Sequence, residues 1–248
     1  MLNNHVPHKD STYRLWNIGN YIYMVYFIIL RCAVHPNNSW FDIDADENMS
    51  DVHHSRWPIT KERWEKDVKH IMEVSPSVKL FPGDAVFELG CGTGAFLDTL
   101  VKQQPELSVH GSDINESAIQ RCKAKYHPEN FTLGDLRSLD IDKKFDCIVG
   151  NGVLGYMKSH KDIFDTLVKC DTLLKLGKTM RFTMLDYPCS WQRFLTFRCP
   201  VSSAQTSIPP SLFNSFAQKY NYDVHFSNIN VMNGQKGRRY MVVLYKKN

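Results

Sequence analysis

Residues Ala85–Leu100, AVFELGCGTGAFLDTL, decide the fold of this chain. An apolar, strand-like run ends in an acidic residue, and glycines then occupy three alternate positions, Gly90, Gly92 and Gly94, before an amphipathic helical pattern begins. Glycines allow the backbone to turn sharply and to approach a ligand that a Cβ atom would exclude. The N–H groups at the start of the following helix favour an anionic group. The segment therefore predicts a nucleotide-type cofactor lying across a strand-to-helix turn.

Strand-like and helix-like patterns alternate after this turn, with short connections between them. Such alternation predicts parallel strands joined by crossovers, with helices on both faces of the sheet. At the C-terminus, a helix and two strands joined by a turn at Asn233–Gly237 predict a hairpin and an antiparallel edge. The strands are expected at Ala85–Leu89, Val109–Ser112, Phe131–Leu133, Asp146–Gly150, Thr179–Leu185, Asp223–Ile229 and Arg239–Lys246. The helices are expected at Ile59–Val74, Ala95–Gln103, Glu116–Tyr126, Asp162–Leu174 and Ser211–Tyr220.

The composition is that of an ordinary folded protein, with 43% hydrophobic and 23% charged residues in a chain of 248. This length allows one large α/β domain, or two small ones, with a sizeable core. The net charge of +4 is small and the basic residues are scattered, so we expect no nucleic-acid partner, which would usually bring a basic face or arm. The 7 cysteines are dispersed, without a Cys-x-x-Cys pair. That pattern indicates reduced thiols in a cytoplasmic protein, and neither a disulfide framework nor a metal site.

The N-terminal region carries an apolar run, Leu15–Cys32, whose uninterrupted core Tyr21–Leu30 is only 10 residues long. A membrane-spanning helix needs about 20 apolar residues, and no small-residue cleavage site of a signal peptide follows the run. We therefore favour a buried helix, or an amphipathic helix over an active site, and keep membrane association through residues 15–32 as the alternative. Residues 37–55 are polar and turn-rich and are expected to form a linker or lid.

Two cofactor classes fit the glycine turn taken alone. The segment Gly90-x-Gly92-x-x-Ala95 also matches the dinucleotide fingerprint, with Asp113 near the position of its ribose-binding acid. A single-domain nicotinamide-dependent reductase of this length normally carries a Tyr-x-x-x-Lys pair, however, and the sequence contains none. Acids follow the next two strands, at Asp113 and Asp135, and Asn151-Gly152 makes a second tight loop at the ligand-binding edge of the sheet. These features favour S-adenosylmethionine.

The same motifs resemble those of the class I S-adenosylmethionine-dependent methyltransferases. ELGCGTG (88–94) matches the first motif of that family, and GSDIN (111–115), GDL (134–136) and FDCIVGNGVLGYM (145–157) match the next three in order. The resemblance implies an α/β, Rossmann-like, doubly wound fold, with a mostly parallel seven-stranded sheet and an antiparallel C-terminal hairpin strand. Residues 57–248 would form the methyltransferase domain, and residues 1–56 an N-terminal helical lid segment.

The resemblance also implies how the cofactor would be bound. The turn from Glu88 to Gly94 would wrap its methionine part, with backbone N–H groups facing the carboxylate. Asp113 would accept hydrogen bonds from both ribose hydroxyls, although alone it could also be a turn acid before the next helix. Asp135 would contact the adenine edge by its side chain and Leu136 by its backbone. The implied cofactor-binding residues are Glu88, Gly90, Cys91, Gly92, Gly94, Asp113, Ile114, Asp135, Leu136, Asn151 and Gly152.

Three of these residues have further expected roles. Ile114 would pack on the adenine face, and Asn151 and Gly152 would lie beside the sulfonium and the methyl group to be transferred. Cys91 has a simpler interpretation than cofactor contact, as a small residue packed under the glycine turn. Asp135 has one too, as a turn residue.

The acceptor side of the site is less well defined by the sequence. Methyl transfer from a sulfonium is a direct displacement, so the protein mainly aligns the reactants and excludes water. A general base is needed only for an acceptor that is protonated at neutral pH. The candidate catalytic residues are Tyr156 after the fourth strand, His54 in the expected lid and Asp186 at the end of the fifth strand. Many members of the family carry a histidine pair near the position of Tyr156, which this chain lacks.

We expect methyl transfer to an N or O atom of a small molecule by in-line displacement, because the charge is small and no recognition module is appended. The alternative is a protein or RNA substrate, which would need an extended groove or a partner subunit. The chain is expected to be a cytoplasmic monomer or homodimer.

Overall fold

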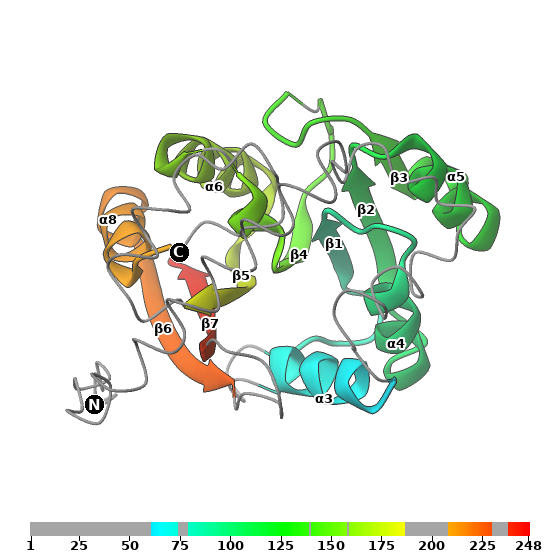
Figure 1. Ribbon diagram of the computed structural model, residues 1–248, viewed down its shortest axis with the longest axis horizontal. Coiled ribbons are helices and arrows are strands. Elements are labelled where there is room, and N and C mark those ends of the chain that lie inside the picture. Colours follow the sequence, from blue (N-terminus) through cyan, green and yellow to red (C-terminus); the bar gives the residue numbers. More distant parts are fainter. Residues whose placement is uncertain (1–60, 74–78, 139, 158, 187–207, 230–237) are drawn as a thin grey trace, which may run out of the picture.

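The computed structural model describes residues 61–248 apart from 74–78, 139, 158, 187–207 and 230–237. Its centre is a seven-stranded sheet in the order β3-β2-β1-β4-β5-β7-β6 (Figure 1). The parallel strands are β1 (Ala85–Leu89), β2 (Ser108–Asp113), β3 (Phe131–Leu133), β4 (Phe145–Asn151) and β5 (Leu174–Asp186). The hairpin strands are β6 (Tyr222–Ile229) and β7 (Arg238–Lys246), and β7 runs antiparallel to both β5 and β6. The expected mostly parallel sheet with an antiparallel C-terminal hairpin is confirmed.

The central strands are apolar on both faces because each face is covered by helices. All five residues of β1 are buried. Successive residues contribute to different cores: Val86 and Cys147 belong to one apolar cluster, and Phe87 and Ile148 belong to the other. Such nearly continuous apolar runs are typical of parallel strands between two helical layers.

The two helical layers are distinct in Figure 1. Helices α6 (His160–Leu173) and α8 (Pro210–Tyr220) pack on one face of the sheet, and α3 (Lys61–Met72), α4 (Ala95–Gln103) and α5 (Glu116–Lys125) pack on the other. Two short 3-10 helices, η2 (Pro128–Asn130) and η3 (Val153–Tyr156), connect elements. Helix α6 begins at His160, before the expected Asp162, because Ser159 is its N-cap and its Oγ accepts a hydrogen bond from Asp162 N at 3.0 Å.

Strand β5 is longer than the sequence pattern predicts. It begins at Leu174 and not at Thr179, and Leu174 pairs with Phe145 before an irregularity in the register with β4. Gly177 in this first part has a φ of 67°. Lysines on both sides of this glycine interrupt the apolar pattern, and the start of the strand was therefore missed.

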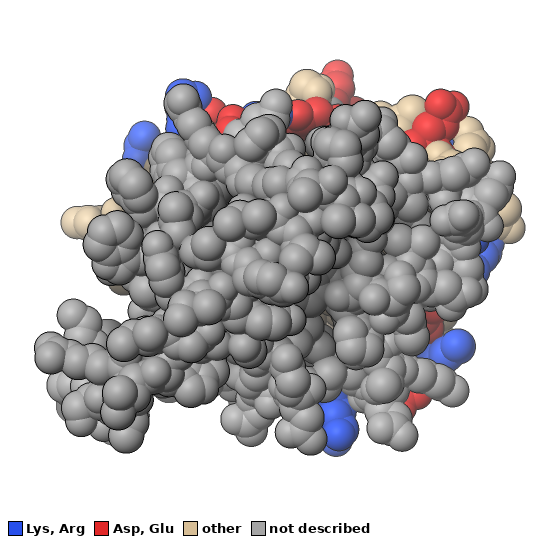
Figure 2. Space-filling view, viewed as in Figure 1, with Lys and Arg blue, Asp and Glu red and all other residues tan. Residues whose placement is uncertain are grey.

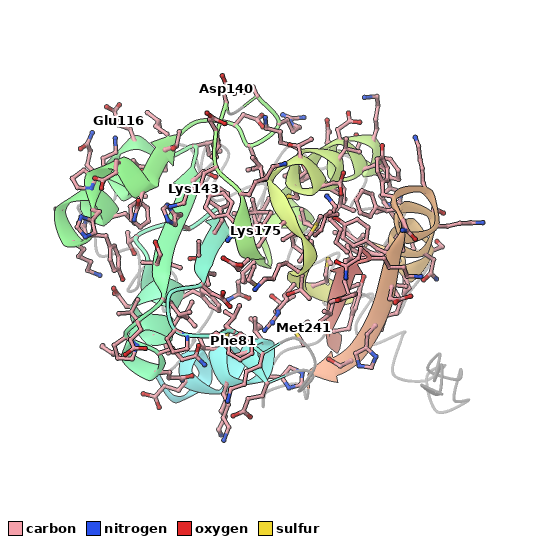
Figure 3. The ribbon with its side chains drawn as sticks, turned by 180° about the vertical axis from the view of Figure 1, so that it is seen from behind. Phe81, Glu116, Asp140, Lys143, Lys175 and Met241 are labelled. Carbon is pink, nitrogen blue, oxygen red and sulfur yellow. The ribbon has the colours of Figure 1, made fainter. Side chains whose placement is uncertain are left out.

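Lys175, which is labelled in Figure 3, belongs to a group of charged residues at the amino-terminal edge of the sheet. The buried Asp146 carboxylate accepts hydrogen bonds from Lys175 Nζ at 2.7 Å and from Ala85 N at 3.0 Å, and Lys178 Nζ lies 3.0 Å from it. Lys178 also reaches Asp84 at 3.4 Å. Burial alone would raise the pKa of Asp146, but these hydrogen bonds hold it below its usual range. We call these four charged residues, Asp84, Asp146, Lys175 and Lys178, the amino-edge cluster.

Several sequence-based expectations lie outside the described residues: the lid segment 1–56 and its boundary, the apolar run 15–32, and the turn at 233–237. Within the described ranges, no helix is both long and apolar enough to span a bilayer. On the face shown in Figure 2, the coloured Lys and Arg side chains stand at separate places around the rim, and Asp and Glu side chains lie along its upper edge and at its lower right.

Candidate functional site

The carboxyl ends of three neighbouring strands meet at one edge of the sheet. The register aligns Leu89 of β1 with Ser112 of β2 on one side and with Gly150 of β4 on the other. Ligands of open α/β sheets bind at this carboxyl edge. The alignment therefore brings the ends of the first, second and fourth strands, with their expected site residues Glu88, Asp113 and Asn151, to one place.

The glycine turn after β1 has the backbone that the sequence predicts. Gly90, Gly92 and Gly94 have φ values of 61°, 51° and 84°, a region that residues with side chains rarely adopt. A Cβ atom on Gly90 would lie 2.5 Å from Val153 Cγ2 in η3, so this glycine also permits close packing of the two loops. Gly94 is the N-cap of α4 and has no side chain with which to cap it. The first N–H groups of α4 therefore form an anion-binding position.

Cys91 packs beneath this turn, in agreement with its simpler interpretation. The side chain is buried, and a Cβ atom on Gly111 of β2 would lie 2.9 Å from its Sγ atom. Cys122 of α5 supports the turn from the same side, because its Sγ donates to Gly92 O at 3.3 Å. Sequence reasoning missed Gly111, although a glycine inside a strand is a signal of close approach.

Glu88 is the most unusual side chain of the site. It is 3% exposed, and its Oε2 atom has no hydrogen-bond partner among the described residues. Burial raises the pKa of Glu88 well above its ordinary value, and the nearby Cys122, Asp113 and Asp98 raise it further. A buried carboxyl without a partner is costly, and its persistence at a ligand-binding edge indicates a position meant for a hydrogen-bond donor.

Asp113 ends β2 and holds the glycine turn in place. Its Oδ2 accepts a hydrogen bond from Gly92 N at 2.8 Å, and its Oδ1 accepts one from Asn115 N at 2.9 Å. A carboxylate has further lone pairs beyond these two bonds, so both the turn role and the ligand role considered from the sequence are compatible with this geometry. Ile114, the next residue, is exposed despite its large apolar side chain.

The segment after β3 carries the two expected adenine contacts. Leu136 is buried in the core, whereas the Asp135 side chain is exposed enough to meet a ligand. Arg137 binds the Asp135 carboxylate through its guanidinium group and donates from its backbone N to Asp135 Oδ1 at 2.9 Å. This side-chain hydrogen bond holds the pKa of Asp135 below its usual range. Sequence reasoning missed Arg137, because no local pattern shows which acid an arginine will meet.

Asn151 and Gly152 form the loop at the end of β4. Thr183 of β5 holds both of them: its Oγ1 donates to Asn151 Oδ1 at 2.5 Å, and its carbonyl accepts from Gly152 N at 3.0 Å. Gly152 has a φ of 76° and is the N-cap of η3. Thr183 is a further residue that the sequence did not identify, since its contribution depends on the pairing of β4 with β5.

The structure describes the expected catalytic residues less fully than the expected cofactor residues. Tyr156 ends η3, near the Asn151–Gly152 loop in sequence, and its side chain is exposed. Asp186 is the last residue of β5, so its backbone lies at the carboxyl edge. His54 lies outside the described residues.

Comparison with known families agrees with this arrangement. The family model described as a methyltransferase domain matches residues 87–177, from the middle of β1 to the first part of β5. The matched range includes the glycine turn, the acids after β2 and β3, and the Asn151–Gly152 loop. Residues 87–177 thus carry a methyltransferase domain, and the motifs within them resemble those of the class I S-adenosylmethionine-dependent methyltransferases.

Individual methyltransferases resemble part of this chain. A malonyl-[acyl-carrier protein] O-methyltransferase of Ilyobacter polytropus is 30% identical over 101 residues, 40% of this chain and 38% of that protein. A ribosomal RNA small subunit methyltransferase C of Shewanella sediminis is 36% identical over 97 residues, 38% of this chain and 28% of that protein. The chain thus spans well under half of the length of the curated relatives that it matches.

The fold likeness extends further than the sequence likeness. The crystal structure of an S-adenosylmethionine-dependent methyltransferase from Clostridium acetobutylicum aligns with a TM-score of 0.61, over 82% of this chain and 100% of that one, at 12% identity. At this identity the alignment establishes the methyltransferase fold alone.

The residues present in this chain fit S-adenosylmethionine, the methyl donor of that family. The amino acid end of S-adenosylmethionine carries an ammonium group and a carboxylate. The buried Glu88 Oε2 lacks a hydrogen-bond donor among the described residues, and an ammonium group would supply one. The uncapped start of α4 favours a carboxylate. The two ends of the glycine turn thus match the two charges of the molecule.

Proposed function

We propose that this chain is an S-adenosylmethionine-dependent methyltransferase that transfers a methyl group to an N or O atom of a small molecule by in-line displacement. The observation that carries the proposal is the buried Glu88 Oε2 atom, which has no partner among the described residues and lies next to the glycine turn. A buried carboxyl in this state is stabilised by a cationic donor. The order of the motifs and the match of residues 87–177 to the methyltransferase-domain model support the same conclusion.

Each part of the carboxyl edge then has a task. Glu88 accepts from the ammonium group, and the first N–H groups of α4 donate to the carboxylate. Asp113 accepts from the ribose hydroxyls, with Ile114 on the adenine face and Asp135 and Leu136 at its edge. When bound, the sulfonium supplies an already activated methyl group. The chain has only to orient the two reactants and exclude water.

The acceptor would lie beyond the Asn151–Gly152 loop. Thr183 bonds to both residues of this loop and fixes their positions. The loop can therefore line the space through which the methyl group is transferred. Tyr156 follows it and has an exposed side chain, so it is our first candidate for contact with the acceptor. Asp186 and His54 are the other candidates, as orienting group and base. A base is required only for an acceptor that is protonated at neutral pH.

The donor half of the proposal is tested by calorimetry with S-adenosylhomocysteine, which carries the same ammonium and carboxylate groups as the methyl donor. We expect binding in the micromolar range, and loss of binding in Asp113→Ala. Absence of binding to the unmutated chain would falsify the enzyme function.

A protein or RNA substrate is the second candidate, and the match to a ribosomal RNA methyltransferase over 97 residues favours considering it. The two candidates separate when the chain is incubated with S-adenosylmethionine labelled in its methyl group and a cell extract, followed by fractionation by size. Label in the small-molecule fraction supports our proposal. Label confined to macromolecules would establish the alternative, and nuclease and protease treatment would then distinguish RNA from protein.

We also propose the organisation that the sequence predicts around this site. Residues 57–248 form the catalytic domain, and residues 1–56 form a helical segment that covers it. The protein is cytoplasmic, as a monomer or homodimer, with membrane association through residues 15–32 as the alternative. Limited proteolysis with and without S-adenosylhomocysteine tests the first part, because a covering segment should become protected when the ligand binds.

A further inference from the structure

Arg137 connects two parts of the carboxyl edge that are far apart in sequence. Its Nε atom lies 3.0 Å from Asp135 Oδ1 and 3.2 Å from Oδ2, and its second terminal nitrogen also contacts Oδ2. Its other terminal nitrogen donates to Asp162 Oδ1 at 2.5 Å. One guanidinium group therefore joins the segment after β3 to the first turn of α6. The planar fork of arginine suits such a pair of simultaneous contacts.

Asp162 also bonds to the residue that caps the start of its own helix. Its Oδ2 accepts a hydrogen bond from Ser159 Oγ at 2.8 Å, and Ser159 is the N-cap of α6. Ser159 lies three positions after Tyr156, the end of η3. The chain of contacts thus runs from Asp135, through Arg137 and Asp162, to the end of the loop that follows β4.

Stability is a poor explanation for this network. The side chains of Arg137, Asp135 and Asp162 are 40%, 42% and 23% exposed, and ion pairs at such positions contribute little to stability because solvent screens them. Orientation is a better one. The Asp135 carboxylate is held on both oxygens by the side chain of Arg137 and on Oδ1 by the backbone N of the same residue. It cannot rotate without breaking several of these bonds.

A fixed, ionised carboxylate accepts hydrogen bonds and donates none. Beside a purine it therefore favours an amino group, which donates, over a carbonyl group, which accepts. A site built to bond a donor rejects an analogue that lacks one, because the polar groups of the site are then left unpaired. A carboxylate that rotates freely discriminates less well.

We propose that Arg137 is a positioning residue that fixes the Asp135 carboxylate toward the 6-amino group of the cofactor's adenine and so determines the preference for adenine over a 6-oxo purine. This inference rests on the proposed function, in which Asp135 contacts the adenine edge. Through Asp162 and Ser159, the same arginine ties that contact to the start of α6.

The test compares S-adenosylhomocysteine with its deaminated analogue S-inosylhomocysteine, in which a 6-oxo group replaces the 6-amino group and N1 carries a hydrogen. Dissociation constants are measured by calorimetry for the unmutated chain, Arg137→Ala and Arg137→Lys. Lys161→Ala is the matched control, because it removes an exposed ion pair with Asp165 on the same helix. Thermal unfolding of each variant checks that it is folded.

We expect the unmutated chain and the control to prefer the adenosine ligand by about 100-fold. In Arg137→Ala the preference should fall about tenfold, mainly through weaker binding of the adenosine ligand. Arg137→Lys should recover part of the preference, since it restores the charge but not the fork. A merely structural role would weaken both ligands equally.

The failures are distinguishable. If the unmutated chain binds neither ligand, the proposed function itself is wrong. If it binds S-adenosylhomocysteine but Arg137→Ala keeps the full preference, or loses affinity for both ligands in equal proportion, the positioning role of Arg137 is wrong and the proposed function stands.

Discussion

Each edge of the sheet carries a buried carboxyl group, but the two groups differ in their hydrogen-bond partners and in the direction of their pKa shifts. At the amino-terminal edge, Asp146 is bonded to two lysines and a backbone N–H, and its pKa is lowered. At the carboxyl edge, Glu88 Oε2 has no partner among the described residues, and its pKa is raised. Both side chains are nearly inaccessible to water.

The difference separates a structural charge from a functional one. The amino-edge cluster is complete as it stands, because each of its acids has a cationic partner. The position of Glu88 costs stability as long as no donor is bound. Binding of a ligand with a cationic donor would offset this loss of stability. Acids with strongly shifted pKa values are accordingly concentrated at functional sites.

The largest effect is expected from distorting the carboxyl edge with Gly92→Val. A β-branched residue at a φ of 51° is strained, and the turn that presents the N–H groups should be lost. Calorimetry should show S-adenosylhomocysteine affinity reduced at least about 100-fold. The matched control is Gly83→Ala, where φ is also positive at 85° but a Cβ atom meets nothing within 4 Å. Unchanged affinity in Gly92→Val would show that the turn does not hold the donor molecule.

Breaking the amino-edge cluster should give the next largest effect, on stability and not on binding. Asp146→Ala removes the shared partner of Lys175 and Lys178 and leaves the Ala85 N–H without its acceptor. Urea titration should show the free energy of unfolding lowered by about 2–3 kcal/mol, with unchanged affinity for S-adenosylhomocysteine. A loss below about 1 kcal/mol would mean that the lysines regain water at little cost and that the cluster is not stabilising.

Glu88→Gln should change stability and affinity in opposite directions. The substitution removes a buried ionisable group, so the free energy of unfolding of the ligand-free chain should rise by about 1–2 kcal/mol at pH 7. The same change removes the charge that would meet the ammonium group, and S-adenosylhomocysteine should bind about tenfold more weakly. Glu106→Gln, at an exposed glutamate, serves as the control. A variant that binds as tightly as the unmutated chain would remove Glu88 from the proposed site.

The two edges should also respond oppositely to pH. The folded pKa of Asp146 is lowered, so its contribution is present above the ordinary value of 3.8 and is lost as the pH falls through the folded value. The folded pKa of Glu88 is raised, so stability is fully present below 4.5 and declines as the pH rises toward the folded value. The stability difference between the unmutated chain and Asp146→Ala should therefore shrink under acid conditions.

The advantage of Glu88→Gln over the unmutated chain should instead grow from about pH 5 upward, since the unfolded chain ionises first. Denaturant titrations at several pH values measure both trends. Parallel profiles for the two variants would contradict the distinction between the edges.

The smallest effect is expected from Lys161→Ala. Its ion pair with Asp165 is at 82% and 45% exposure, one turn apart on α6. Water and salt screen such exposed pairs, so chemical denaturation should hardly distinguish this variant from the unmutated chain. A clearly lower free energy of unfolding for this variant would show that exposed ion pairs do contribute to the stability of this fold.

The sequence predicts those features that are encoded locally. The strand-to-helix turn follows from its glycines, and the order of strands and helices follows from apolar periodicity. Strands β1 and β3 and helix α4 have the expected bounds. The expected cofactor residues are recognisable because each lies within a few positions of a strand end, where the topology brings them together.

Features that depend on long-range packing could not be predicted. Arg137 meets Asp162 across 25 positions of sequence, and Thr183 meets Asn151 across 32. The early start of β5 depends on pairing of Leu174 with Phe145, which no pattern in the Leu174–Lys178 segment reveals. A glycine inside a strand, such as Gly111, signals a close approach, but only the structure shows that the approaching residue is Cys91.

The raised pKa of Glu88 also makes ligand binding an acid–base event. An ammonium group beside Glu88 would lower this raised pKa again, so ligand binding is expected to release protons from Glu88 to the solvent. The heat measured by calorimetry would then contain the ionisation heat of the buffer. The binding enthalpies measured in phosphate and in Tris should differ for the unmutated chain and coincide for Glu88→Gln. The difference between the two buffers then gives the number of protons that Glu88 releases when the ligand binds.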